Sequence, residues 1–523
     1  ASADYLVTAA DVGHALSATA IYTDGQGFVE TVTTAPTPPI GVLAVQALAG
    51  APGATVTISN TLTDPDGDAT PETTFYEWET STNGVDWVPA IPAQVSADGL
   101  SLTQGNSTTR FVRVTTLFID AAGNFNTATS DPVRVLSGNG NNNTLNGVAG
   151  VDIFFGLGGA DTVNTGGGND ILVGGAGNDD LNGGAGNDTF LYTVGDGADT
   201  VTGGAGADLL AIRGTAGANT LNVTFNGARI TAFQGGTVNN AVEAITANLL
   251  GGADTLIYTA PGGVNVELAA GTASGFASIA GIENVSGNGG VDTITGDDGA
   301  NVINGNGSAD TLNGGGGADT LDGGAGVDIL NGGAGGDILI GMTGADTINL
   351  GVADDNAVDR VLFGATNEFG DTGSNFDATG TAAQIDRIEF GAALNAAYDD
   401  GNNNDNFVFA VGNGGAGAVN ALVGQNNADV EALLLTGANG EGVTTANLGN
   451  AAAVAAAFNA EFNITAANGE DAVLVINDTD GNSFAVWQWI QAGGGETAAA
   501  ELTLIGIFSA NATVTTGSFD FFP

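Results

Sequence analysis

The sequence predicts a β-dominated protein in which sandwich-like strands precede a parallel β-roll and a mixed β/α C-terminal domain. Three observations favour this fold class. Residues 287–349 fall into seven consecutive nine-residue units, each with glycine at position one and an aliphatic residue at position eight. A second array with the same pattern begins at Gly138. Between residues 41 and 136, and again near the C-terminus, apolar and polar residues alternate with the period of two expected of β-strands.

The nine-residue period predicts the geometry of the roll. Glycine accepts backbone conformations that a Cβ would block, so the first six residues of each unit form a tight turn. The last three form a short strand whose middle side chain, at position eight, points into the core. Two units make one coil, and each unit stacks on the unit two places further along. In residues 287–349 the eighth positions are Ile294, Ile303, Leu312, Leu321, Leu330, Leu339 and Ile348.

Position six carries the chemistry, because it is aspartate in most units. Carboxylates and backbone carbonyls are the hard oxygen ligands that Ca²⁺ prefers, and the pattern G-G-x-G-x-D-x-U-x is typical of a calcium-binding parallel β-roll. We therefore expect multiple bound Ca²⁺ ions. Asn143 replaces the aspartate in the first unit of the first array, which predicts that this end binds calcium weakly or serves as a cap. Asn301 replaces it in the second array, where we expect a calcium site that is left partly open. The predicted metal ligands are Asp152, Asp161, Asp170, Asp179, Asp188, Asp199, Asp208, Asp292, Asp310, Asp319, Asp328, Asp337 and Asp346.

These units resemble those of the RTX family, bacterial proteins exported by type I secretion. The resemblance implies a secreted, extracellular protein with its export signal near the C-terminus. RTX blocks occur in toxins, proteases, lipases, adhesins and surface-layer proteins, so the repeats alone do not specify a function.

The chain divides at changes in pattern. Residues 1–38 and 39–136 resemble bacterial immunoglobulin-like modules, the first of them partial, with Trp78 as the expected core tryptophan of the second. The acidic stretch at 64–68 is either a calcium site or an ordinary polar turn. The predicted domains are 1–38, partial immunoglobulin-like module; 39–136, immunoglobulin-like sandwich; 137–211, first RTX array; 212–286, intervening β segment; 287–350, second RTX array; and 351–523, C-terminal capping and secretion domain.

Two segments leave the nine-residue register. Residues 212–286 predict a β segment that continues or interrupts the roll, with a separate ligand-binding domain as the alternative. Residues after 350 predict strands that cap the open end of the roll, because an uncapped roll exposes its apolar core. Within the C-terminal domain we expect short helices at 428–435 and 451–462, and a hairpin whose second strand carries Trp487 and Trp489.

The composition limits the classes of binding partner that we expect. The chain has 58 acidic residues against seven arginines and no lysine, a net charge of −51. Nucleic acid and anionic membranes need basic surfaces, so both are excluded as expected partners. The charge opposes compaction until counter-ions bind, and calcium is the natural counter-ion. No cysteine is present, and no apolar run is long enough to cross a bilayer. No secretory signal is visible, and we expect the chain to start within a longer protein.

An enzyme is not expected. The single histidine, His14, lies among the N-terminal strands, and the chain lacks the lysine and cysteine that Schiff-base and thiol chemistry require. Two functions remain. The first is a structural cell-surface protein, either a surface-layer subunit or an adhesin, that folds and assembles on binding extracellular calcium by self-association or through surface components. The second is the calcium-dependent export module of a larger secreted enzyme, such as a peroxidase or hydrolase.

Overall fold

The computed structural model describes the strands and loops that carry the repeats almost without interruption. His14, the acidic stretch at 64–68 and residues 478–481, where the predicted C-terminal hairpin turns, lie outside the described residues. The described residues are 19–23, 29–33, 43–48, 55–60, 75–97, 101–103, 108–119, 125–129, 132–239, 241–352, 357–363, 371–376, 386–390, 409–412, 432–435, 449–455, 471–477, 483–490, 502–510 and 519–521.

The chain forms two compact units, one of residues 1–213 with 234–245 and one of residues 214–233 with 246–523. The first unit begins with an antiparallel hairpin of β1 (Thr19–Thr23) and β2 (Val29–Thr33), as the alternation and turn in this segment predict. Its immunoglobulin-like character stays a prediction.

The next strands of the first unit form two sheets. One is the antiparallel sheet β3 (Leu43–Leu48), β4 (Thr55–Asn60) and β7 (Ser101–Thr103). The other contains β5 (Phe75–Ser81), β6 (Val88–Pro89), β8 (Thr108–Ile119), β9 (Phe125–Thr129) and β10 (Val133–Asn139). A short 3₁₀ helix, Pro92–Gln94, follows β6.

Strand β10 joins the sandwich-like part to the roll. It pairs antiparallel with β8 on one side and parallel with β12 (Asp152–Gly158) on the other. One sheet of the roll then continues through β14 (Ile171–Ala176), β16 (Thr189–Thr193) and β18 (Leu209–Arg213). The other sheet contains β11 (Thr144–Asn146), β13 (Thr162–Asn164), β15 (Asp180–Ala185), β17 (Thr200–Ala205) and β21 (Gly236–Val238).

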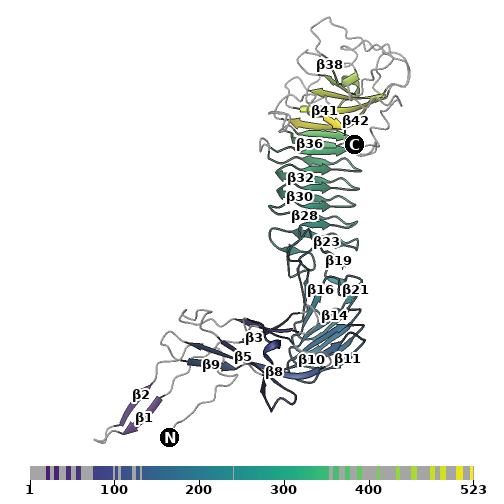
Figure 1. The fold of residues 1–523 in the computed structure, drawn as a ribbon. Helices are drawn as coiled ribbons and strands as arrows, with labels where there is room; N and C mark the ends of the chain where they lie inside the picture. Colours follow the sequence, from purple (N-terminus) through teal and green to yellow (C-terminus); the bar gives the residue numbers. More distant parts are fainter. Residues whose placement is uncertain are drawn as a thin grey trace. The chain divides into compact units, whose positions relative to one another are not determined.

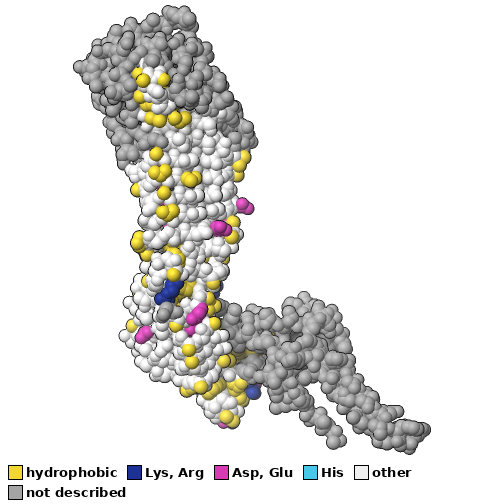
Figure 2. Space-filling view, turned by 180° about the vertical axis from the view of Figure 1, so that it is seen from behind, with side chains coloured by type: hydrophobic (Ala, Val, Ile, Leu, Met, Phe, Trp, Pro, Cys, Tyr) yellow, Lys and Arg dark blue, Asp and Glu magenta, His cyan; other side chains and the backbone are white. Residues whose placement is uncertain are grey.

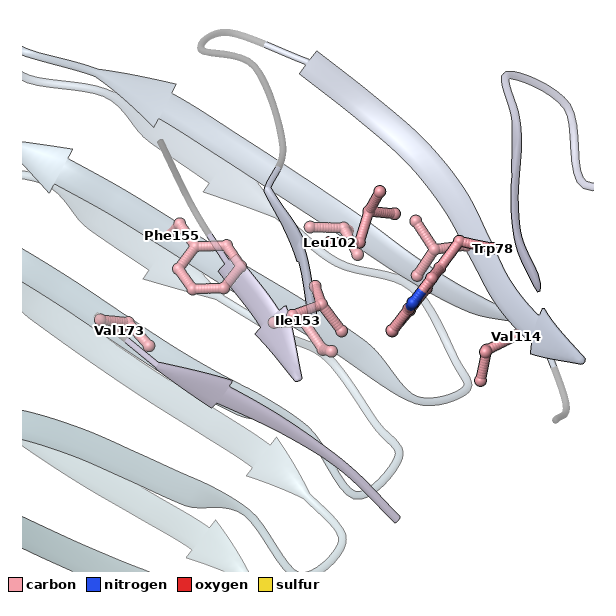
Figure 3. Close-up of a cluster of buried hydrophobic side chains, with 9 residues drawn as sticks. Trp78, Leu102, Val114, Ile153, Phe155 and Val173 are labelled. Atoms are coloured by element: carbon pink, nitrogen blue, oxygen red, sulfur yellow. The ribbon is translucent and has the colours of Figure 1, made fainter. Parts of the chain in front are cut away.

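A single apolar core links the sandwich-like sheets to the first coils (Figure 3). Trp78 of β5 is 3% exposed, which confirms it as a core residue, and it belongs to the same cluster as Ile153 and Phe155 of β12 and Val173 of β14. These three β-roll residues occupy positions seven and nine, which point away from the inside of the roll. The first coils are therefore buried on both faces, as strands with continuous apolar sequence usually are.

The second unit starts with the segment between the arrays. Strand β19 (Thr220–Phe225) forms a hairpin with β20 (Ile230–Phe233) and pairs parallel with β23 (Thr255–Tyr258), which pairs with β27 (Asn284–Ser286). Strand β22 (Ala244–Asn248) pairs with β26 (Ser278–Ala280), and β24 (Asn265–Glu267) with β25 (Thr272–Ala273). Within this unit the segment thus forms parallel strands that lead into the second array, together with an inserted hairpin.

The second array is a regular stack of short parallel strands (Figure 1). Strands eighteen residues apart pair in register, for example Ile294 with Leu312 and Ile303 with Leu321, which confirms two units per coil. All seven eighth-position side chains are fully buried. One sheet contains β28 (Thr293–Thr295), β30 (Thr311–Gly316), β32 (Ile329–Ala334) and β34 (Thr347–Asn349). The other contains β29 (Val302–Asn304), β31 (Thr320–Asp322) and β33 (Ile338–Ile340).

Strands after the repeats extend both edges of the stack. β34 pairs with β36 (Asp371–Phe376), which pairs with β42 (Leu502–Ala510), and β33 pairs with β35 (Arg360–Phe363), then β37 (Arg387–Phe390) and β43 (Phe519–Phe521). Phe508 of β42 stacks on Phe484, with ring centroids 5.3 Å apart. The chain after the repeats thus covers strands that the roll would otherwise leave exposed.

The predicted C-terminal hairpin is present, formed by β40 (Asp471–Asn477) and β41 (Ser483–Ile490). Residues 451–455 are helical, as predicted, and the rest of that predicted helix is outside the described residues. The helix predicted at 428–435 is wrong at its C-terminal half, because β39 (Ala432–Leu435) pairs with β38 (Phe409–Gly412) and β40. Three consecutive leucines there satisfy a buried strand as well as a helix, and sheet pairing decides between them.

Candidate metal centres

The sixth-position side chains are buried and form ladders along both edges of each array. Asp310, Asp328 and their counterparts are at most 2% exposed. In each ladder the backbone N–H of one sixth-position residue donates to Oδ1 of the sixth residue of the next coil, as Asp310 does to Asp328 at 2.8 Å and Asp328 to Asp346 at 2.8 Å. The predicted residues brought together in this way are Asp152, Asp170, Asp188 and Asp208; Asp161, Asp179 and Asp199; Asp292, Asp310, Asp328 and Asp346; and Asp319 and Asp337.

The second carboxylate oxygen of many of these residues has no hydrogen-bond donor although it is buried. A buried charged oxygen without a partner costs several kcal/mol, so this regular series of oxygens calls for a cation at each of them. The Oδ2 atoms concerned include those of Asp161, Asp179, Asp188, Asp208, Asp254, Asp310, Asp319 and Asp328.

Glycine at position one leaves the space into which these oxygens point. A Cβ on Gly314 would clash with Oδ2 of Asp319 and with the carbonyl oxygen of Gly332, and a Cβ on Gly156 would clash with Oδ2 of Asp161 and the carbonyl of Gly174. Two oxygens from different turns therefore flank one small space. Carboxylate and carbonyl oxygens converging in this way fit Ca²⁺, which accepts oxygen ligands in flexible geometry.

Each of these cradles holds a backbone carbonyl oxygen beside one carboxylate oxygen. In the described part of the chain, no three or more acidic, histidine or cysteine side chains cluster so that they could hold a metal. The carboxylates are nevertheless perturbed. Burial raises the pKa of Asp199 and Asp310 to about 7 and that of Asp179 and Asp319 to about 6, against the opposing effect of the backbone N–H bond. A bound cation would restore the charged form.

The ladders extend beyond the residues that the repeat pattern predicts. The N–H of Asp208 donates to Oε2 of Glu243, and that of Asp254 donates to Oε2 of Glu283. After the second array, Asp346 donates to Asp371, Asp337 to Asp359, and Asp359 to Asp386. These links span 22 to 35 residues instead of eighteen, so a fixed period misses them. Their common signal in the sequence is weak: an acidic residue lies at, or one position before, the first residue of a short strand.

Some turns differ from this pattern. Both oxygens of Asp152 accept bonds from the guanidinium of Arg134, at 2.7 Å each. Thr165, which replaces the first-position glycine, is fully buried and donates its hydroxyl to the carbonyl of Gly183. Asn301 is 2% exposed and its amide donates to the carbonyl of Glu283. The expectation of a partly open site beside Asn301 is therefore wrong, because the amide closes the turn.

The ladder carboxylates are buried, so they add little charge to the surface of the described coils. Over the described coils, the face in Figure 2 has few acidic side chains, because the ladder aspartates point inwards. Asparagines at position nine form a second, outer ladder, in which Asn349 donates to Asn331 at 2.8 Å. No helix among the described residues is long and apolar enough to span a membrane.

Comparison with known proteins agrees with this geometry. The RTX calcium-binding nonapeptide repeat matches the chain four times, over residues 137–172, 155–190, 286–321 and 322–357. No curated protein matches the chain. Proteins with these repeats are typically secreted. RTX nonapeptide repeats bind calcium, and the chain is therefore a calcium-binding protein with multiple Ca²⁺ sites held in a β-roll.

Proposed function

We propose that the ladder aspartates with a donor-free inner oxygen are the calcium ligands of this protein. Each ion would accept Oδ2 of one aspartate and carbonyl oxygens of neighbouring turns, as the cradle at Gly314 indicates. Bound Ca²⁺ supplies positive charge and cross-links turns that are distant in sequence. Because unfolded chains lack such a site, binding stabilises the folded roll. The predicted ligands Asp152 and Asp292 belong to ladders, but both oxygens of each accept bonds from protein donors. In the unit of Asp170, Thr165 replaces the first-position glycine.

On this basis we propose a structural role at the cell surface, as a surface-layer subunit or an adhesin. The observation that supports it is the continuity of the first unit. Strand β10 belongs both to the sandwich-like sheet and to the roll, and Trp78 and Phe155 lie in one core. Calcium bound to the roll therefore stiffens the sandwich-like part as well, as a spacer that carries load requires.

Calcium would also control assembly. The formal charge of −51 opposes contact between copies of the chain, and calcium reduces that charge. We expect purified protein to pass from monomer to ordered oligomers or sheets as Ca²⁺ rises into the millimolar range, where extracellular calcium modules bind at about 10⁻⁴ to 10⁻³ M.

Light scattering and electron microscopy, with Ca²⁺ titrated and then chelated, test this role. Reversible ordered assembly at millimolar Ca²⁺, absent with equal Mg²⁺, is the expected result. A strict monomer at every calcium concentration would contradict it and favour the second candidate, the export module of a larger secreted enzyme.

A further inference from the structure

The four runs of nonapeptide units share an unusual first turn. Two runs lie in the first unit and start at Asp152 and Asn143; two lie in the second unit and start at Asp292 and Asn301. In each first turn, N–H groups of the protein already bond the oxygens that face inwards elsewhere. We propose that each run starts with a calcium-free cap, and that Arg134, Asn143 and Asn301 determine which turns take no ion. This inference rests on the ligand assignment proposed above.

Arg134 supplies a permanent cation to the first cap. It pairs with Asp152 in the parallel register of β10 and β12, the relation that Asp152 has to Asp170 one coil later. Its Nε and Nη2 each lie 2.7 Å from one oxygen of Asp152, and the N–H of Val148 adds a third bond at 3.1 Å. The bidentate guanidinium–carboxylate pair is a strong, charge-assisted contact. The guanidinium neutralises the charge of Asp152 and bonds both of its oxygens, so no oxygen is left to attract calcium.

Asn301 forms its cap with an amide. Its Oδ1 accepts the N–H of Asp297 at 2.9 Å, and its Nδ2 donates to the carbonyl of Glu283 at 2.7 Å. The surrounding cradle is the same as in a calcium turn. A Cβ on Gly296 would clash with Oδ1 of Asn301 and the carbonyl of Gly314, just as one on Gly314 would clash with Asp319 and Gly332. At the sixth position the two turns therefore differ in one chemical group, an amide or a carboxylate.

Asn219, at the start of the segment between the arrays, shows how an amide nitrogen satisfies such a turn. Its Nδ2, which carries two hydrogens, lies within hydrogen-bond distance of four oxygens: the carbonyls of Thr215 at 3.2 Å, of Leu249 at 3.4 Å and of Gly217, and Oδ1 of Asp254 at 2.8 Å. A carboxylate in the same place would present a negative oxygen to these oxygens and would need a cation between them. The amide removes that need.

The remaining caps follow the same rule. Asn143 accepts the N–H of Asn139 at 2.7 Å, and a Cβ on Gly138 would clash with its Oδ1 and with the carbonyl of Gly156. Asp292 keeps a carboxylate, but its two oxygens accept the N–H groups of Val264 and Asn288, both at 2.8 Å. Of the four first turns, only that of Asn143 begins a sheet, because β11 is an end strand; those of Asp152, Asp292 and Asn301 each follow a strand that lies outside the nine-residue register. In all four, groups of the protein bond the inward-facing oxygen that lacks a donor in the later turns.

The test is to convert a cap into a calcium turn. In the full chain, Asn301→Asp should add one Ca²⁺ per molecule, because its second oxygen would face the carbonyl of Glu283, whereas the second oxygen of Asp292 accepts the N–H of Val264. The ions are counted by atomic emission after equilibrium dialysis and by calorimetric titration with Ca²⁺ alone. Asn143→Asp should add one Ca²⁺ in the first unit. This variant tests the inference if Asn301→Asp does not fold. Circular dichroism in excess calcium reports folding.

The matched control is Asp319→Asn, the reverse change in the neighbouring turn of the same ladder, which should lose one Ca²⁺. The proposal of calcium-free caps is overturned if both Asn301→Asp and Asn143→Asp bind the wild-type number of ions while Asp319→Asn loses one. That result would leave the ligand assignment intact. An unchanged number of ions in Asp319→Asn would instead contradict the ligand assignment itself. A gain of one ion in either cap variant supports the inference.

Discussion

The same nine-residue rule builds two arrays whose outer faces meet different surroundings. In the first coils of the first array, Ile153 at position seven is 1% exposed, because it packs in the core shared with the sandwich-like sheets. In the second array Ile329, at the same position, is 50% exposed. Both arrays bury their eighth position and their ladder of carboxylates. The first array therefore has an apolar support that is independent of calcium, and the second depends on one buried aliphatic residue per unit and on the ion.

The largest expected difference between the arrays comes from these two isoleucines. Ile153→Ala should lower the free energy of unfolding of the first unit by about 2–5 kcal/mol in saturating calcium, because it leaves a cavity in a closed core. Ile329→Ala should change the stability of the second unit by about 0.5 kcal/mol or less, as is usual at exposed positions. Denaturant unfolding of the two variants measures both changes. Equal losses in the free energy of unfolding would contradict the comparison.

Removal of one ligand in the second array should have the next largest effect. Asp328→Ala deletes a buried ladder carboxylate, so one calcium ion should be lost. For a site with a dissociation constant of about 10⁻⁴ to 10⁻³ M, 10 mM calcium contributes about 1.4–2.7 kcal/mol, which the variant should lose. Calorimetric titration and thermal melts measure both quantities. Asp298→Ala, at an exposed aspartate of the same array, is the control and should bind calcium like the wild type.

The pH dependence of calcium-free protein should report the buried carboxylates. Burial raises the pKa of Asp310 to about 7 and that of Asp319 to about 6, above the value of about 3.9 of an unfolded aspartate. The folded state then binds more protons between pH 4 and 7, so the free energy of unfolding falls as pH rises through that window. Protein dialysed free of calcium should show a melting transition of the second array at pH 4.5, and a transition at lower temperature, or none, at pH 7.5.

Calcium should weaken or reverse this trend. The ion needs ionised ligands, so its affinity rises as pH rises through the same window. Melts repeated in 10 mM calcium, a concentration of about ten or more times the expected dissociation constant, are the control. A melting temperature of the calcium-free protein that increases with pH would show that these carboxylates are not protonated in the folded roll.

The smallest expected effect concerns a single departure from the glycine pattern. Ser308 replaces the fourth-position glycine and adopts a φ of 78°, in the left-handed region. Ser308→Gly relieves about 1 kcal/mol of strain but removes the hydroxyl bond to the carbonyl of Gly289, 2.8 Å long, which contributes about 1 kcal/mol. The net change in the free energy of unfolding should stay within about 1 kcal/mol. A larger loss in thermal melts would show that the hydroxyl has another role.

The sequence predicted the repeating part of the fold in detail, because one period fixes turn, strand and core position together. It predicted the ladder aspartates for the same reason. It missed Glu243, Glu283 and Asp371, since an inserted hairpin or a long loop changes the spacing while the ladder continues. It also missed the core shared by β10, β12 and the sandwich-like sheets. The apolar residues at positions seven and nine, in IFF at 153–155, were the available signal.

The caps could not be predicted from the repeat pattern. An asparagine at position six shows that a carboxylate is missing, but the acceptor of its amide comes from another coil, as with Asn301 and Glu283. The partner of Asp152 is Arg134, which lies before the first unit in a strand that belongs equally to the sandwich-like sheet. Such partners are set by three-dimensional register, which a single unit does not contain.

Hydrogen exchange of the full chain, followed by mass spectrometry with saturating calcium and after chelation, tests the central claim most directly. Chelation should abolish protection in β28 to β34, where the buried Oδ2 atoms of Asp310, Asp319 and Asp328 have no donor, and should reduce it less in β10, β12 and β14, which the core around Trp78 and Phe155 supports. Full protection of residues 287–349 in excess chelator would contradict the account, because those carboxylates would then be stable without the ion.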